Sequence, residues 1–229
     1  MKRRFALFAL PALVLLTAAA PPRKAPARPA PKPPVSAPLG DVVRVAMVTT
    51  LGTIEVELDH KHAPITTENF VRYVDLKRFD GMNFYRVMRL PWGTPPNGII
   101  QTGLSGDPTK VLKPIAHEPT SQTGSLHKAG TLSMARNAPG TATADFSILL
   151  SDLEGFDADP KSTNPELQAG YAAFGRVVSG MDVVRKIYDS PLSPTKGMGL
   201  LKGQMLDPPI KVLTVRRVAS PPPAPVPAP

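Results

Sequence analysis

The sequence contains no cysteine, and this absence excludes several classes of protein. Disulfide scaffolds and zinc sites built on thiolates both require cysteine. A lipoprotein anchored through an N-terminal cysteine is excluded for the same reason. The fold must therefore rest on an apolar core, and a folded portion of about 180 residues suits one domain with a sizeable core.

The motifs of conventional catalysis are also missing. The chain has no phosphate-binding loop, dinucleotide fingerprint, G-x-S-x-G elbow or D-x-D-x-D-G calcium loop. His60 and His62 lack further ligands at a suitable spacing, so we interpret them as part of a solvated loop. The acidic residues 145–159 are interpreted in the same way. We therefore expect neither a metal nor a cofactor.

The first 20 residues have the three parts of a secretory signal peptide. They begin with the basic MKRR, continue with an apolar stretch and end with the small residues TAAA. The apolar stretch is short for a membrane span and contains Pro11. Cleavage after Ala19 is preferred to cleavage after Ala20, because Pro21 would make a poor first mature residue. We expect a periplasmic protein with no stable membrane insertion after cleavage, and full secretion stays open.

Two low-complexity segments flank the expected domain at residues 40–219. Residues 21–39 form a basic linker rich in proline and alanine, and residues 220–229 form a proline-rich tail. The linker should sample extended polyproline II and act as a spacer. Of the formal charge of +9, only +2 belongs to residues 39–229. That balance gives no indication of nucleic-acid binding.

Hydrophobic patterning predicts a mainly β domain. The run TIEVEL alternates cleanly between apolar and acidic residues, as a half-buried strand does. The expected strands cover residues 42–50, 53–58, 83–88, 98–101, 130–135, 146–150, 172–178 and 210–218. Amphipathic helices are expected at residues 63–74 and 181–188. Eight strands with one early and one late helix indicate a closed antiparallel barrel.

The segment DGMNFYRVM places an arginine inside an apolar strand. Under strict alternation, Phe84, Arg86 and Met88 share one face. An unpaired charge on such a face is costly, so Arg86 must be paired, extended to water or functional. From these residues alone, a paired or extended arginine is the simpler interpretation.

Five segments together carry a family resemblance. They are TTLGTIEVELDHKHAPITTENFVRYV, FDGMNFYRVM, IIQTG, GTLSMAR and YAAFGRVVSGMDVV, in this order. The chain from Val42 to Val218 thereby resembles the cyclophilin-type peptidyl-prolyl cis-trans isomerases, especially the shorter bacterial ones. The resemblance implies an eight-stranded barrel capped by two helices. It also implies isomerisation of Xaa-Pro bonds in client polypeptides without a cofactor.

The resemblance assigns catalytic roles to Arg86 and Gln101. In the family, the arginine of the F-x-R motif faces the substrate groove. It would hydrogen-bond the prolyl nitrogen as the amide twists, an interaction that strengthens only in the transition state. The glutamine of IIQTG would bind the substrate backbone. The implied substrate-binding positions are Phe84, Ile99, Ala135, Arg136, Asp145, Phe146, Ser147, Phe156 and Tyr171.

Three positions depart from the family pattern. Asp145 replaces a glutamine, Ser147 replaces the aromatic floor of the proline pocket, and Gly98 replaces a further aromatic residue. Two lost aromatic contacts would remove several kcal/mol of apolar binding, at ~1.5–3 kcal/mol each. The loop at residues 89–97 is longer than usual and holds the only tryptophan. We hypothesise that Trp92 covers the pocket in place of a lost ring.

Three functions stay open at this point. The retained arginine and glutamine favour an isomerase acting on envelope proteins, which we expect to be monomeric. The departures favour a catalytically weak or inactive peptide-binding or chaperone module. A scaffold acting through its proline-rich tails is the third, and removing the tails would distinguish it.

Overall fold

The structure, a computed structural model, describes residues 38–93 and 97–219. The predicted signal peptide, the C-terminal tail and all but the last two residues of the linker lie outside this range. Among the described residues, no helix has both the length and the apolar run that a bilayer crossing needs.

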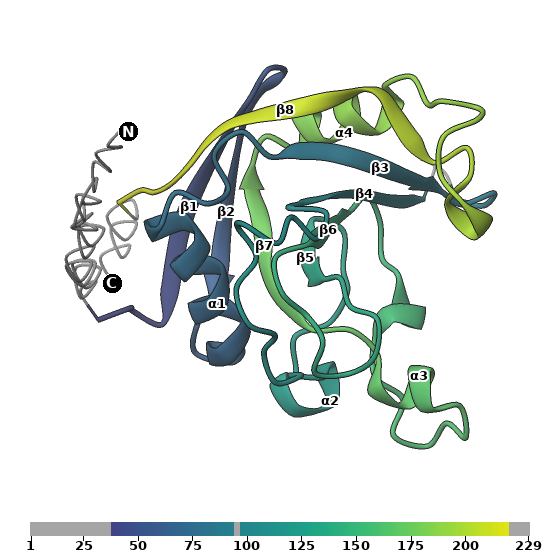
Figure 1. Ribbon diagram of the computed structural model, residues 1–229. Helices are drawn as coiled ribbons and strands as arrows, with labels where there is room; N and C mark the ends of the chain where they lie inside the picture. The colour runs from purple at the N-terminus through teal and green to yellow at the C-terminus, as the bar shows by residue number, and fades with distance from the viewer. Residues whose placement is uncertain (1–37, 94–96, 220–229) are drawn as a thin grey trace, which may run out of the picture. The chain divides into compact units, whose positions relative to one another are not determined.

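Eight antiparallel strands close into one barrel (Figure 1), which confirms the predicted fold. Their bounds are β1 (Val42–Thr49), β2 (Gly52–Asp59), β3 (Asn83–Arg89), β4 (Gly98–Gly103), β5 (Thr131–Met134), β6 (Phe146–Leu149), β7 (Ala173–Ser179) and β8 (Met205–Arg217). Around the barrel the order is β1-β2-β7-β5-β6-β4-β3-β8, and β8 pairs again with β1. Closure removes the free sheet edges that invite edge-to-edge pairing.

The two predicted helices are present as α1 (Pro64–Asp75) and α4 (Met181–Asp189). They lie on different sides of the barrel in Figure 1, and each buries one face in its core. Four short pieces were not predicted: α2 (Thr120–Thr123), η1 (Glu154–Phe156), α3 (Pro165–Ala169) and η2 (Gly199–Leu201). They are too short to show a helical period in the sequence.

A distant carboxylate caps the first turn of α1. Ala63 stands at the N-cap and supplies no side-chain acceptor. The buried Glu118 instead accepts hydrogen bonds from the backbone N–H groups of Ile65 at 3.0 Å and Thr66 at 2.7 Å. A negative charge at a helix N-terminus is favourable, so this contact joins α1 to the segment before α2.

Aromatic side chains form the centre of the barrel core. The ring of Phe70, from α1, lies 5.0 Å from that of Phe79, 5.1 Å from that of Phe146 and 5.6 Å from that of Phe174. These distances fall in the range of favourable aromatic pairs. Phe70 therefore connects its helix to strands that are far apart in the sequence.

Strict alternation along β3 was a wrong expectation. Phe84 pairs with Thr102 and Arg86 pairs with Gln101, so Tyr85 is an extra residue in a β-bulge. The bulge turns Phe84 into the barrel core and leaves Arg86 on the outer face. The arginine is consequently not placed between two large apolar neighbours on one face.

A second irregularity explains why β8 was predicted too short. The strand begins at Met205, and residues 206–209 contain two prolines, which the sequence pattern treats as breakers. Met205 pairs with Arg86 and Ile210 with Phe84, so these four residues lie opposite a single residue of β3. The prolines are tolerated because they stand outside the regular hydrogen-bond ladder.

Truncation of the central ring should destabilise the whole barrel. We expect Phe70→Ala to lower the free energy of unfolding by about 3–5 kcal/mol, because it leaves a cavity among buried rings. Leu213→Ala, at a side chain that is 45% exposed, is the matched control and should cost less than about 1 kcal/mol. Urea unfolding followed by circular dichroism measures both values. Equal losses in the two variants would contradict this account of the core.

Candidate active site

Arg86 is held between two glutamine side chains on the outer face of the barrel. Its Nε donates to Oε1 of Gln204 at 2.8 Å, and its Nη1 donates to Oε1 of Gln101 at 2.8 Å. Burial lowers the pKa of Arg86 from its ordinary value, and the neighbouring Tyr85 and Tyr171 oppose that shift. The guanidinium remains protonated in neutral solution. A fixed, partly desolvated cation therefore faces outward from β3.

The arginine ends a row of polar side chains that crosses four strands. Arg86 is paired with Gln101 on β4, Gln101 with Ser147 on β6, and Ser147 with Ser133 on β5. Directly opposed residues on neighbouring strands share a face of the sheet. The structure thus brings together the predicted catalytic pair and Ser147, and adds Ser133, which the sequence did not suggest.

Two expected substrate contacts lie elsewhere. Phe84 and Phe146 are both fully buried and belong to the barrel core. The bulge at Tyr85 turns Phe84 inward, and Phe146 alternates with the outward Ser147 on β6. These two rings support the site from inside the barrel and do not line the groove.

A separate apolar cluster lies outside the barrel on the same face as Arg86. Ile99, Leu149 and Leu153 form its centre, with Met88, Leu90 and Phe156 packed against them. An adjoining cavity of about 430 Å³ is lined by Met88, Leu90, Trp92, Leu153 and Phe156, together with Asp152, Glu154 and Gly155. Trp92 and Phe156 therefore line one apolar cavity, a position that agrees with the hypothesis for Trp92 without testing it.

The ring of Tyr171 lies between Phe156 and Arg136 and packs against both of them. The rings of Phe156 and Tyr171 are 5.0 Å apart, and the Arg136 guanidinium carbon lies 4.8 Å from the centre of the Tyr171 ring. The side chain of Arg136 is 1% exposed and donates to the carbonyl oxygen of Gly170 and to Glu166. Arg136 thus fixes Tyr171 and α3, and its guanidinium is already engaged.

Asp145 forms the border of the site near β4. Its Oδ1 accepts from the Tyr85 hydroxyl at 3.1 Å and from the backbone N–H of Ser105 at 2.9 Å. Burial raises the pKa of Asp145. Its backbone oxygen also accepts from the N–H of Ala135 at 2.9 Å. The carboxylate that replaces the family glutamine therefore orders the bulged strand and a neighbouring loop.

Comparison with known proteins agrees with this geometry. The family model described as cyclophilin-type peptidyl-prolyl cis-trans isomerase/CLD matches residues 44–216. The chain belongs to the cyclophilin-type isomerases. A peptidyl-prolyl cis-trans isomerase of Acinetobacter baylyi is 37% identical over 178 residues, which cover 75% of this chain and 84% of that protein. One from Streptomyces antibioticus is 35% identical over 157 residues, covering 67% of this chain and 87% of that protein.

A solved structure shares the fold of this isomerase. A crystal structure of a Cryptosporidium parvum cyclophilin-type isomerase matches with a TM-score of 0.60 at 19% identity. The match covers 79% of this chain and 99% of that one. A second structure of the same protein, solved in the presence of the dipeptide Ala-Pro, has a TM-score of 0.59. The retained barrel and the family match identify an enzyme of prolyl isomerisation.

The isomerase also contains a buried histidine whose surroundings the sequence did not reveal. His127 is fully buried, with Nδ1 2.7 Å from Oδ1 of Asp157 and Nε2 2.9 Å from the Ser133 hydroxyl. Its ring packs edge-on against Phe156 at 5.6 Å. Burial lowers the pKa of His127 and favours the neutral ring, while the contact with Asp157 opposes that shift. Ser133 and Asp157 lie 6 and 30 residues from His127 in the sequence, so no local motif predicts these contacts.

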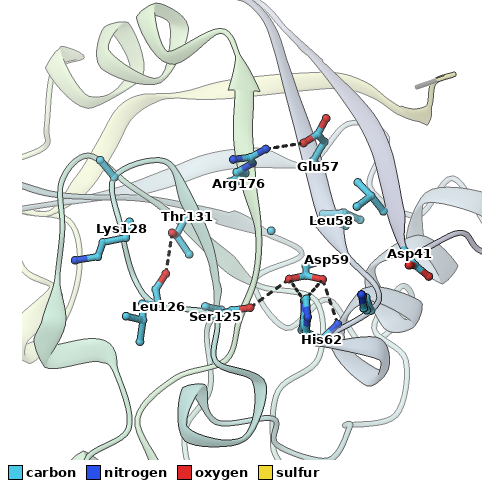
Figure 2. A pocket seen from close by; sticks show the side chains of 15 residues that line it. Asp41, Glu57, Leu58, Asp59, His62, Ser125, Leu126, Lys128, Thr131 and Arg176 are labelled. Carbon is cyan, nitrogen blue, oxygen red and sulfur yellow. Dashed lines mark hydrogen bonds and ion pairs between the residues drawn. The ribbon is translucent and has the colours of Figure 1, made fainter. Parts of the chain in front are cut away.

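A cavity of about 680 Å³ lies away from Arg86, beside β2 and β7. Its lining includes Glu57, Asp59 and Arg176, which are labelled in Figure 2. Arg176 donates to Glu57 at 3.1 Å, and His62 Nδ1 lies 2.8 Å from Oδ2 of Asp59. The carboxylates of Glu57 and Asp59 are thus engaged by neighbouring side chains, and none of the expected site residues lines the cavity. Within residues 38–93 and 97–219, no group of three or more potential ligands has metal-binding geometry.

Acid should weaken the fold through His127. Its pKa lies below the ordinary value of about 6.5, so the unfolded chain binds the proton first as the pH falls. The contribution of His127 to the free energy of unfolding is present in full above pH ~6.5. It is lost as the pH falls toward the pKa of His127 in the folded protein, by at most about 1.4 kcal/mol per pH unit.

The pH-dependent stabilisation by His127 is measured by urea unfolding of wild type and His127→Asn between pH 7.5 and 5. Asp145 titrates in the opposite sense, so the informative quantity is the difference between the two proteins. That difference should shrink on acidification. A difference independent of pH would show that His127 does not titrate as proposed.

Proposed function

We propose that this isomerase accelerates the rotation of Xaa-Pro bonds by donating a hydrogen bond from Arg86 to the prolyl nitrogen of the twisted amide. The supporting observation is the fixed position of the guanidinium between Gln101 and Gln204. An arginine has five N–H groups, and these two contacts use two of them, which leaves three for a substrate.

The chemistry requires little more than this contact. A planar amide resists rotation with a barrier of ~18–20 kcal/mol, because nitrogen shares its lone pair with the carbonyl. Twisting localises that lone pair and makes the nitrogen a hydrogen-bond acceptor. A donor already in position therefore stabilises the twisted state more than the planar one. Because Arg86 is oriented before substrate arrives, little reorganisation is needed at the moment of rotation.

The substrate would lie across the polar row with its proline against the apolar cluster. Gln101 accepts from Arg86 through Oε1, so its amide N–H₂ remains to donate to the substrate backbone. Ile99 and Phe156 provide apolar surface for the proline ring, and Trp92 lines the adjoining cavity. These contacts replace part of the apolar surface lost with Ser147 and Gly98, and the positioned guanidinium of Arg86 supports turnover over an inactive binding module.

We infer further that the clients are exported polypeptides of the bacterial envelope. The basic start, apolar stretch and small-residue end of the first 20 residues support this location. Isomerisation needs neither ATP nor a redox partner, so the activity suits a compartment that lacks nucleotide.

Removal of the guanidinium should abolish most of the rate enhancement. We expect Arg86→Ala to lower kcat/KM for a short Ala-Pro peptide by about 100-fold, the usual effect of losing one transition-state donor. Arg86→Lys should recover only part of the activity, because a lysine has a single cationic centre and no planar fork. Exchange NMR between the cis and trans peptide signals measures these rates.

Arg176→Ala is the matched control, since this arginine is 72% exposed and lines the cavity remote from Arg86. It should retain wild-type exchange. If Arg86→Ala kept full exchange while circular dichroism showed a native fold, the enzyme would remain but this mechanism would be wrong.

Export should leave a defined N-terminus. We expect the mature protein expressed from the full-length chain in a Gram-negative host to begin at Ala20 and to appear in the periplasmic fraction. Intact-mass measurement of that fraction tests the cleavage site, and a version lacking the first 19 residues is the control. An uncleaved chain in the cytoplasm would contradict the proposed location and leave the isomerase mechanism unaffected.

A further inference from the structure

The segment KGMGLLKGQ exposes apolar side chains to an unusual degree. Met198 is 88% exposed, Leu200 is 92% exposed and Leu201 is 40% exposed. We call residues 196–204 the projecting turn; it includes η2 and connects α4 with β8. Single apolar residues are common on protein surfaces, whereas neighbouring ones that protrude together mark interaction sites.

The backbone of the projecting turn is well ordered. The N–H of Gly203 donates to Lys196 at 3.1 Å and closes the turn, and inside it the N–H of Leu201 donates to Met198 at 3.0 Å. Gly197 and Gly203 have φ values of 91° and 79°, which only glycine adopts readily. These glycines shape a turn that holds Met198 and Leu200 outward.

The projecting turn is joined directly to the catalytic arginine. Gln204 accepts from Arg86 through Oε1 and donates through Nε2 to the carbonyl oxygen of Leu200 at 2.8 Å. Its backbone oxygen also accepts from the N–H of Val87 at 2.8 Å. In Figure 1 the yellow-green turn lies beyond the ends of β3 and β4. One side chain thus connects the exposed apolar surface with the substrate groove.

We propose that the projecting turn is a second client-binding surface, which holds apolar residues of an unfolded polypeptide while a nearby Xaa-Pro bond occupies the groove. Continuity with the groove through Gln204 identifies the occupant as the polypeptide undergoing isomerisation. An unfolded chain offers apolar side chains on both sides of a proline, whereas a folded protein buries them. The proposal rests on the isomerase activity and does not depend on the role of Arg86.

The double variant Met198→Ser/Leu200→Ser tests this surface. One substrate is a reduced, carboxymethylated small protein whose refolding is limited by one prolyl bond, and the other is a short Ala-Pro peptide. We expect KM for the unfolded protein to rise about tenfold, because two apolar side chains lose their contacts. Exchange of the short peptide should stay at the wild-type rate, since the groove is untouched.

Two further variants identify the cause. Met198→Leu/Leu200→Met keeps the apolar surface and should retain the wild-type KM. Leu213→Ser removes an exposed apolar side chain from β8 and should leave both substrates unaffected. An unchanged KM for the unfolded protein in the double serine variant overturns the proposal, as does an equal loss with both substrates. Sedimentation with anionic phospholipid vesicles that is lost in the double serine variant, with KM unchanged, would reassign the turn to a membrane surface.

Discussion

Two amide oxygens, one on each side of β3, determine where the Arg86 guanidinium lies. Gln101 belongs to β4, and Gln204 directly precedes β8, so both neighbours of β3 in the closed barrel contribute one contact. The strand order is therefore more than a scaffold, because it places three residues that are far apart in sequence around one charge. The bulge at Tyr85 is equally necessary, since it turns Arg86 outward while Phe84 enters the core.

The barrel also separates the polar side chains of the site from its apolar ones. A polar row crosses β3, β4, β6 and β5, and a separate apolar cluster is centred on Ile99; in the proposed function the first donates hydrogen bonds and the second supports the proline ring. Beneath them, His127 joins Asp157 to Ser133 and packs on Phe156, so the wall of the groove is tied to its floor. Fixing these groups in advance is what makes a small number of hydrogen bonds effective in catalysis.

Much of the fold was predictable because it follows from local periodicity. All eight strands and both long helices show their pattern within one segment, and five segments in order carry the family resemblance. The start of β8 was missed because its prolines stand in a bulge that only the pairing with β3 reveals. Phe84 faces the core because of the bulge at Tyr85, which reverses the side on which a residue points, whereas Phe146 faces the core because it alternates regularly with Ser147 along β6.

The site was predictable only where a residue type carries its own chemistry. Arg86 and Gln101 stood out through their motifs, whereas Gln204 and Ser133 act through contacts across strands that no sequence spacing encodes. The central claim is that Arg86 acts on the twisted amide and contributes little to ground-state binding. The most direct measurement is the Kd of a short Ala-Pro peptide for wild type and Arg86→Ala, by NMR titration. The account predicts values within about twofold of each other. A Kd that weakens in proportion to the loss of catalysis would show that Arg86 binds the substrate uniformly and would contradict the account.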